Sequence, residues 1–165
     1  MRRVVWSIGS NVGDRLAHLQ SAVDAIAGRG AVVAVSPVYE TDPWGPVDQD
    51  DFLNAVVISE SAASPEELLT LAGDIEQAAA RTRPVRWGPR TLDVDLVVVG
   101  DEVRTTDALT LPHPRAAERA FVLVPWAAAD PAARLAGVPV AELLGALPGG
   151  DVDGVRRTDH VLRTS

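Results

Sequence analysis

The fold of this chain is decided by the stretch Arg81-Thr-Arg-Pro-Val-Arg-Trp-Gly-Pro-Arg-Thr-Leu-Asp-Val-Asp-Leu-Val-Val-Val-Gly100. Its first half holds four arginines and no acid: Arg81, Arg83, Arg86 and Arg90. Its second half, residues 93–99, is apolar on both faces beyond Asp95, which predicts a central, buried strand. Alternate side chains of a strand share a face, so Asp93 and Asp95 project together. The stretch therefore predicts cations that bind phosphate oxygens directly before two carboxylates that can hold Mg²⁺.

Outward from this stretch, the chain alternates strand-like and helix-like segments. Periodicity predicts strands at residues 4–8, 31–38, 52–59 and 93–99, and helices containing residues 16–26 and 64–75. Residues 9–14 are expected to form a turn in which Asn11 or Asp14 caps the first helix. Ser64-Pro-Glu-Glu67 has the residues of a helix start, with serine as the N-cap and glutamate three positions later.

The resulting order βαββαβ is the ferredoxin-like arrangement, an α+β class in which helices cover one side of an antiparallel sheet. Beyond Gly100 we expect helices over residues 116–129 and 140–146, followed by a C-terminal extension whose structure after Pro148 has no prediction. Residues 1–165 show neither an internal repeat nor a long linker, so a single domain is the simplest organisation.

Composition excludes several classes of function. All 15 basic residues are arginine, and the absence of lysine excludes both a P-loop and Schiff-base catalysis. The absence of cysteine excludes disulfides, zinc–thiolate sites and thiol nucleophiles. A net charge of −8 argues against nucleic-acid binding. The start of the chain lacks a secretory signal pattern, and no apolar run reaches the roughly 20 residues of a membrane helix. We therefore expect a cytoplasmic monomer without membrane or nucleic-acid partners.

A set of motifs resembles a known family. The segment Arg86-Trp-Gly-Pro-Arg-Thr-Leu-Asp-Val-Asp-Leu96 is similar to the signature of the hydroxymethyldihydropterin pyrophosphokinases of the folate pathway. Further similar motifs follow in the family's order: Ile8-Gly-Ser-Asn11, Tyr39-Glu-Thr41, Gly45-Pro46, Phe52-Leu-Asn-Ala55, Leu111-Pro-His-Pro114 and Arg119-Ala-Phe121. The family's fold is ferredoxin-like, in agreement with the order derived from periodicity.

The resemblance implies transfer of the β,γ-diphosphate of ATP to the hydroxymethyl group of a dihydropterin, giving AMP. Two Mg²⁺ ions would lie between the triphosphate and the carboxylates of Asp93 and Asp95, and Arg81 and Arg90 would join these acids as catalytic residues. The positions that match the family's ATP-binding residues are Glu76, Arg81, Arg83, Arg90, Leu96, Thr110, His113 and Arg119. The positions that match its pterin pocket are Thr41, Asp42, Trp44, Phe52, Asn54, Trp87 and Phe121.

Some positions depart from the family pattern. The segment Pro84-Val-Arg86 is one residue shorter than in some members, Phe52 lacks the hydroxyl of a frequent tyrosine, and Trp44 replaces a smaller aliphatic residue. Ala108 and Pro114 stand where some members carry arginine and tyrosine. The resemblance implies different individual contacts at these positions, whereas the two carboxylates, Arg90, Asn54 and Phe121 match the family.

Simpler interpretations of the same residues exist. The paired acids are also typical of a solvated strand end, the arginines of an exposed basic loop, His113 of a rigid turn between prolines, and the phenylalanines of an ordinary core. Two rival functions remain on these grounds. One is another metal-dependent nucleotidyl or glycosyl transferase that uses an Asp-x-Asp pair. The other is a non-enzymatic ferredoxin-like module, either a small-molecule sensor or an RNA-binding domain, although the acidic charge opposes RNA binding.

Overall fold

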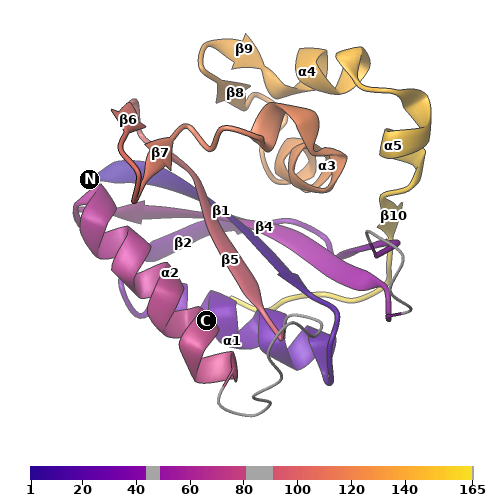
Figure 1. Cartoon of the computed structure of the whole chain (residues 1–165), viewed down its shortest axis with the longest axis horizontal. Coiled ribbons are helices and arrows are strands. Elements are labelled where there is room, and N and C mark those ends of the chain that lie inside the picture. Colours follow the sequence, from indigo (N-terminus) through magenta and orange to yellow (C-terminus); the bar gives the residue numbers. More distant parts are fainter. Residues whose placement is uncertain (44–48, 81–90, 165) are drawn as a thin grey trace.

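An antiparallel sheet forms the centre of the fold (Figure 1). The structure is a computed structural model in which residues 1–43, 49–80 and 91–164 are described. β4 (Phe52–Ser61) pairs with β1 (Arg2–Ser10), and β1 pairs in turn with β5 (Asp93–Val99). Along its other edge β4 pairs with β2 (Ala31–Val35) and with β3 (Tyr39–Thr41). This order confirms the predicted βαββαβ arrangement and the α+β class.

One face of the sheet is covered by the two long helices, α1 (Arg15–Ala27) and α2 (Pro65–Ala80). Every second side chain of β1 points into this layer, and Trp6 among them is 1% exposed. The indole Nε1 of Trp6 donates a hydrogen bond of 2.9 Å to the hydroxyl of Ser59 on β4. The one polar atom of this large core side chain is thereby satisfied, as a buried donor requires.

Both helices begin at the expected capping residues. Asp14, rather than Asn11, caps α1: its carboxylate accepts a hydrogen bond of 3.1 Å from the backbone N–H of Ala17. At the start of α2, the Ser64 hydroxyl accepts from the backbone N–H of Glu67, and the Glu67 carboxylate accepts from the backbone N–H of Ser64. These reciprocal bonds satisfy donors that have no partner inside the helix, which explains where each helix begins.

The opposite face of the sheet is also covered, which corrects the expectation of helices on one side only. α3 (Ala120–Ala129) lies on this face, and α4 (Val140–Ala146) packs against α3 (Figure 1). Leu123 and Trp126 of α3 share a core cluster with Val5 and Val56 of the sheet. The apolar residues of β1 and β4 on this side need cover, and the chain beyond β5 supplies it. The predicted helices at residues 116–129 and 140–146 are confirmed, the first with a 3-10 turn before α3.

Two strand predictions were wrong in detail. The strand expected at residues 31–38 ends at Val35, as β2, and β3 at Tyr39–Thr41 is a further strand that was not predicted. The segment between them contains Pro37, which has no backbone N–H to donate. β5 was expected to be central but lies at the edge of the sheet, where β1 is its strand partner. Its side chains are apolar on both faces because helical layers cover both faces of the sheet at this edge as well.

The remaining elements are short. They are β6 (Arg104–Thr105), β7 (Thr110–Leu111), η1 (Ala116–Glu118), β8 (Arg134–Leu135), β9 (Val138–Pro139), α5 (Gly149–Asp153) and β10 (Arg156–Arg157). β10 pairs with β3, so the end of the chain returns to the sheet. Within the described ranges, every helix is too short or too polar to cross a bilayer.

Candidate active site

A cavity of about 860 Å³ opens on the face of the sheet that carries α3. Its floor is made by residues of three neighbouring strands: Ser7, Gly9, Phe52, Asn54, Asp93 and Asp95. Its walls come from the end of β3, from the segment that leads into α3, and from the C-terminal segment around α5. Among the residues that the structure describes, eight of the twelve expected to bind substrate or metal therefore meet at one place, although they are far apart in the sequence.

Small residues of β1 keep the centre of this floor open. β1 lies between β4 and β5, and its Gly9 is paired with Asn54 on one side and with Asp93 on the other. Ser7 is likewise paired with Asp95. Because paired residues of neighbouring strands share a face, larger side chains at these two positions of β1 would occupy the space between the carboxylates and the amide.

Asp93 and Asp95 share one face of β5, as expected, and both line the cavity. A carboxylate oxygen of Asp95 lies 4.0 Å from a guanidinium nitrogen of Arg119. Across the described ranges, no three acidic, histidine or cysteine side chains form a cluster that could enclose a metal ion. Two carboxylates at an open cavity suit a hard cation such as Mg²⁺, which retains water and binds phosphate oxygens in place of a full protein cage.

Asn54 presents an amide to the cavity from a buried position. Asn54 is 4% exposed, and its Nδ2 donates a hydrogen bond of 2.8 Å to the hydroxyl of Thr41 on the neighbouring β3. A Cβ at Gly9 would stand only 2.8 Å from the Asn54 Oδ1. The glycine thus leaves the room that this amide orientation needs, and the orientation is fixed before any ligand arrives.

Aromatic and cationic side chains meet at the wall formed by α3. Phe121 lines the cavity, and the Arg119 guanidinium carbon lies 5.5 Å from the centre of its ring. Phe52 lines the cavity from the floor. An arginine within about 6 Å of an aromatic face is attracted to the ring. Arg119 is consequently oriented by both Phe121 and Asp95.

His113 lies beside this cluster. Its backbone N–H donates to the carbonyl of Val97 on β5 at 2.8 Å, and its Nδ1 accepts from the backbone N–H of Arg115 at 3.2 Å. Burial lowers the pKa of His113 below its ordinary value; the nearby Arg119 and Arg115 act in the same direction, and Asp95 opposes them. The imidazole is therefore neutral near pH 7 and holds its proton on Nε2, the nitrogen available to a ligand.

Four of the expected ATP-binding residues that the structure describes do not line the cavity: His113, which lies beside it, and Glu76, Leu96 and Thr110. Glu76 lies on α2, where its carboxylate accepts from the backbone N–H of Val94 at 2.9 Å. The Leu96 side chain is 5% exposed and belongs to the core under α1 and α2. Thr110 is exposed on β7. Five further predictions, together with Arg86, lie outside the described residues: Trp44, Arg81, Arg83, Trp87 and Arg90.

The cavity has lining residues that the sequence analysis missed. Arg115 and Glu118 precede Arg119 in the segment before α3, and Asp151 and Val155 come from the C-terminal segment. Arg115 follows the Pro-His-Pro motif by one residue, so its proximity to His113 was a usable signal. No pattern in the sequence indicated that residues 149–155 return to a site built on the sheet.

Except for the wall formed by the C-terminal segment, the cavity is built from the part of the chain that matches a protein family. The model of the family described as 7,8-dihydro-6-hydroxymethylpterin-pyrophosphokinase (HPPK) matches residues 5–131. The chain is 51% identical to a Mycobacterium leprae protein, over 99% of this chain and 92% of that protein. It is 50% identical to a Mycobacterium tuberculosis protein, over 94% of this chain and 89% of that protein. Both relatives bear the name 2-amino-4-hydroxy-6-hydroxymethyldihydropteridine pyrophosphokinase.

Solved structures are similar in fold. A crystal structure of Plasmodium falciparum HPPK-DHPS with SDX-DHP matches 88% of this chain with a TM-score of 0.72 and 13% sequence identity. The chain spans 44% of the length of that protein. At this identity the structural likeness concerns the fold, whereas the family is given by the sequence matches. On those matches, this chain belongs to the HPPK family.

Proposed function

We infer that this chain transfers the β,γ-diphosphate of ATP to the hydroxymethyl group of 6-hydroxymethyl-7,8-dihydropterin in folate biosynthesis. The observation that carries this function is about 50% identity, along nearly the whole chain, to proteins named as pyrophosphokinases of this pterin. The cavity supports it, because two carboxylates and a preoriented amide with aromatic neighbours line the same space. A cytoplasmic location and a monomeric state are part of the same proposal.

We assign the pterin to the part of the cavity around Asn54. A flat heteroaromatic ring requires apolar faces and a few polar groups on its edge. Phe121 and Phe52 supply aromatic surface, and the Asn54 amide supplies a donor and an acceptor, with Thr41 holding it in place. Asp42 belongs to the same wall. Trp44 and Trp87 are assigned to this pocket from the family match.

We assign the triphosphate to the opposite part of the cavity, around β5 and the segment before α3. Asp93 and Asp95 would hold two Mg²⁺ ions, which when bound neutralise phosphate charge and polarise the phosphoryl oxygens. Arg119 and His113 donate hydrogen bonds to phosphate oxygens, and Arg115 adds a cation on the same wall. From the family match, the ATP site also includes Glu76, Arg81, Arg83, Arg90, Leu96 and Thr110. Glu76 and Leu96 would contribute indirectly, by fixing the backbone of β5 that carries the two acids.

The reaction then depends on positioning more than on covalent catalysis. The hydroxymethyl oxygen of the pterin attacks the β-phosphorus of ATP, the bond from that phosphorus to the α,β-bridging oxygen breaks, and AMP leaves with the bridging oxygen. The hydroxyl proton passes to water or to a phosphate oxygen. Asn54 binds the edge of the pterin ring and thereby positions the hydroxymethyl oxygen for attack. Arg119 and His113 stabilise the negative charge that develops on the transferred group. The wall from α3 excludes water from the ring face.

Product analysis tests this function. Purified protein is incubated with ATP, Mg²⁺ and 6-hydroxymethyl-7,8-dihydropterin, and nucleotides and pterins are separated by chromatography. AMP and the pterin diphosphate are expected together, and only when both substrates and the metal are present. ADP as the nucleotide product would overturn diphosphate transfer in favour of a single phosphoryl transfer. Tight pterin binding without nucleotide turnover would indicate the sensor function instead.

A matched pair of variants tests the assignment of the metal site. Asp95→Asn removes a charge at the cavity, and Asp101→Asn removes the same charge from an exposed turn just beyond β5. Asp95→Asn is expected to lose the AMP formation that depends on Mg²⁺, whereas Asp101→Asn is expected to keep wild-type turnover. Equal activity in the two variants would contradict the carboxylate site.

A further inference from the structure

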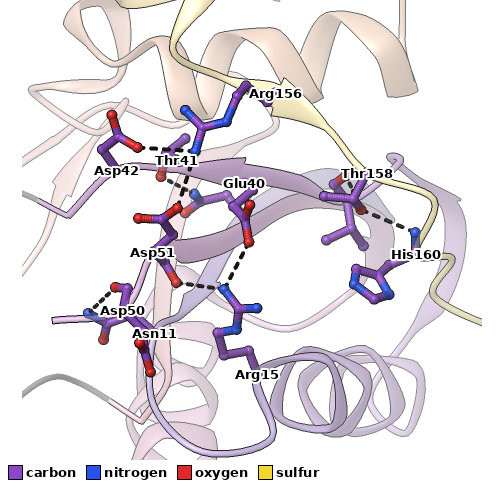
Figure 2. A network of polar contacts seen from close by, with 12 residues as sticks. Asn11, Arg15, Glu40, Thr41, Asp42, Asp50, Asp51, Arg156, Thr158 and His160 are labelled. Carbon is purple, nitrogen blue, oxygen red and sulfur yellow. Dashed lines mark hydrogen bonds and ion pairs between the residues drawn. The ribbon is translucent and has the colours of Figure 1, made fainter.

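The guanidinium of Arg156 connects two acids at the end of the β3–β4 pair. One of its terminal nitrogens, Nη2, lies 3.1 Å from a carboxylate oxygen of Asp42 and 3.3 Å from one of Asp51 (Figure 2). Thr41 and Phe52 form the last pair between β3 and β4. Asp42 follows Thr41 and Asp51 precedes Phe52, so both acids lie one position beyond this last pair. Arg156 therefore closes the end of the strand pair where backbone hydrogen bonds no longer do so.

The same end is held from the other side by residues near α1. Arg15 donates to the carboxylate of Glu40 at 3.1 Å and to the backbone carbonyl of Asp51 at 2.8 Å (Figure 2). Asn11 donates to the backbone carbonyl of Asp50 at 3.2 Å. These contacts fix the backbone that enters β4, whereas the contacts of Arg156 fix the carboxylate of Asp51 and its position relative to Asp42.

This closure adjoins the part of the cavity that we assign to the pterin. Asp42 lines the cavity and follows Thr41, whose hydroxyl accepts the hydrogen bond from Asn54. Arg156 also follows Val155, another lining residue, and its Nη1 makes a longer contact of 3.4 Å with the carbonyl of Gly154. One side chain thus joins two walls of the cavity that come from opposite ends of the chain.

The C-terminal segment is docked independently of this arginine. The Thr158 backbone N–H and hydroxyl both donate to the carbonyl of Val38 at 2.9 Å. Leu162 is 6% exposed in the core beneath the sheet. Gln20 on α1 exchanges two hydrogen bonds with the backbone of Arg163, at 2.8 and 2.9 Å. A change at Arg156 therefore leaves the segment attached and alters only the junction of the two walls.

We propose that Arg156 is a positioning residue for the pterin pocket, a role that rests on the proposed function. Asp42 and Asp51 both contact the same nitrogen of Arg156, so their carboxylates lie close together. When the positive charge of Arg156 is removed, these two carboxylates repel each other. Asp42 then moves toward solvent, because its side chain is 78% exposed and no other side chain holds it within the described ranges. Thr41 follows, and the Asn54 amide loses its fixed orientation. The residue lies beyond the segment that the family model matches, which ends at residue 131.

Arg157 provides the matched control. It is the same residue type on the same two-residue strand, it is exposed, and its guanidinium contacts no acid within the described parts of the chain. Exposed ion pairs contribute little to global stability, so Arg156→Ala and Arg157→Ala are expected to unfold at temperatures within about 2 °C of each other. Any difference in substrate binding between them then reports on the pocket.

The test is calorimetric titration with 6-hydroxymethyl-7,8-dihydropterin, with and without Mg²⁺ and a non-hydrolysable ATP analogue, together with steady-state assays. Arg156→Ala is expected to raise the pterin Kd and KM roughly three- to tenfold, with the analogue Kd and kcat unchanged. Arg156→Lys recovers part of the affinity, because an ammonium keeps the charge and lacks the planar fork. Asp51→Asn is expected to reduce the penalty of Arg156→Ala, since it removes the repulsion.

Equal pterin Kd values for Arg156→Ala and Arg157→Ala overturn the positioning role, as does a loss in kcat or in affinity for the ATP analogue that equals the loss for the pterin. The outcome is separable from that of the proposed function. Wild-type protein that binds the pterin without forming AMP overturns the function, while the comparison of the two arginine variants still decides the role of Arg156. Wild-type protein that does not bind the pterin overturns both.

Discussion

A single methyl group at Gly9 is expected to damage pterin binding selectively. Gly9 lies on β1 between Asn54 and Asp93, and the Cβ of an alanine there would stand 2.8 Å from the Asn54 Oδ1. This distance is about 0.6 Å short of the 3.4 Å at which ordinary contact begins. The carbonyl of Leu53 is the next nearest atom, at 3.6 Å, so the amide alone must move.

The magnitude follows from the bonds that the amide loses. Asn54 is 4% exposed, and a shift of its side chain breaks the 2.8 Å hydrogen bond to Thr41 that orients the amide. Leaving a buried polar group unpaired costs about 1–3 kcal/mol. Since about 1.4 kcal/mol corresponds to a factor of ten in affinity, the pterin Kd of Gly9→Ala should rise roughly 10- to 100-fold. None of the three atoms nearest to this Cβ belongs to Asp93, Asp95, Arg119 or His113, so we expect a smaller effect on the proposed ATP site.

The assay compares Gly9→Ala with Gly73→Ala. A Cβ at Gly73, on the exposed side of α2, would meet no atom within 4 Å. Alanine in a helix is favoured over glycine by about 0.5–1 kcal/mol, so this control should be slightly more stable than wild type with unchanged binding. Titration with the pterin and with an ATP analogue gives both Kd values, and urea unfolding gives stability. A pterin Kd within twofold of wild type in Gly9→Ala, or an equal loss for both ligands, would refute the reasoning.

Three further outcomes are expected. Asp95→Ala should abolish AMP formation and keep the fold, because its ion pair with Arg119 is long and exposed and contributes below about 1 kcal/mol; near-normal turnover with Mg²⁺ would contradict the metal site. In metal-free protein, NMR titration should place the pKa of His113 below 6.5, and Arg119→Gln should raise it. Because the unfolded chain binds this proton more readily, His113 lowers stability as the pH falls below 6.5 and contributes nothing well above it. Ser59→Ala should destabilise the fold by about 1–3 kcal/mol in urea unfolding by leaving the Trp6 N–H unpaired, and an unchanged midpoint would count against that hydrogen bond.

The elements of the fold could be predicted where the signal is local. The bounds of β5 and the capping of α2 agree with the sequence, because alternation and capping depend on residues within a few positions of one another. The predicted central position of β5 was wrong. Apolar side chains on both faces of a strand indicate that both faces are buried, but they do not indicate how many strands pair with it. The end of β2 before Ser36-Pro37 was missed, because the valine-rich run of residues 31–35 made the apolar segment look continuous up to Val38.

The candidate site was predicted unevenly for the same reason. Asp93 and Asp95 share a face by strand geometry alone, and the structure adds that Asn54 and Phe121 line the same cavity. The resemblance had selected these residues as a set, whereas it gave no indication of Arg115 or of the wall formed by Asp151 and Val155. Leu96 was assigned to the ATP site from the resemblance, yet the alternation of side chains along β5 turns it into the core on the opposite face of the sheet.

The sequence by itself determined the order of helices and strands, the shared face of the two acids, and the classes of chemistry that require lysine or cysteine and are therefore excluded. It also determined the family, because the matched motifs occur in a fixed order. Only the tertiary structure decided that α3 covers the second face and that the end of the chain returns to β3. Arg156 meets Asp42 across 114 positions of sequence. Periodicity reports neighbours along the chain, whereas such contacts depend on how the packed layers bring distant segments together.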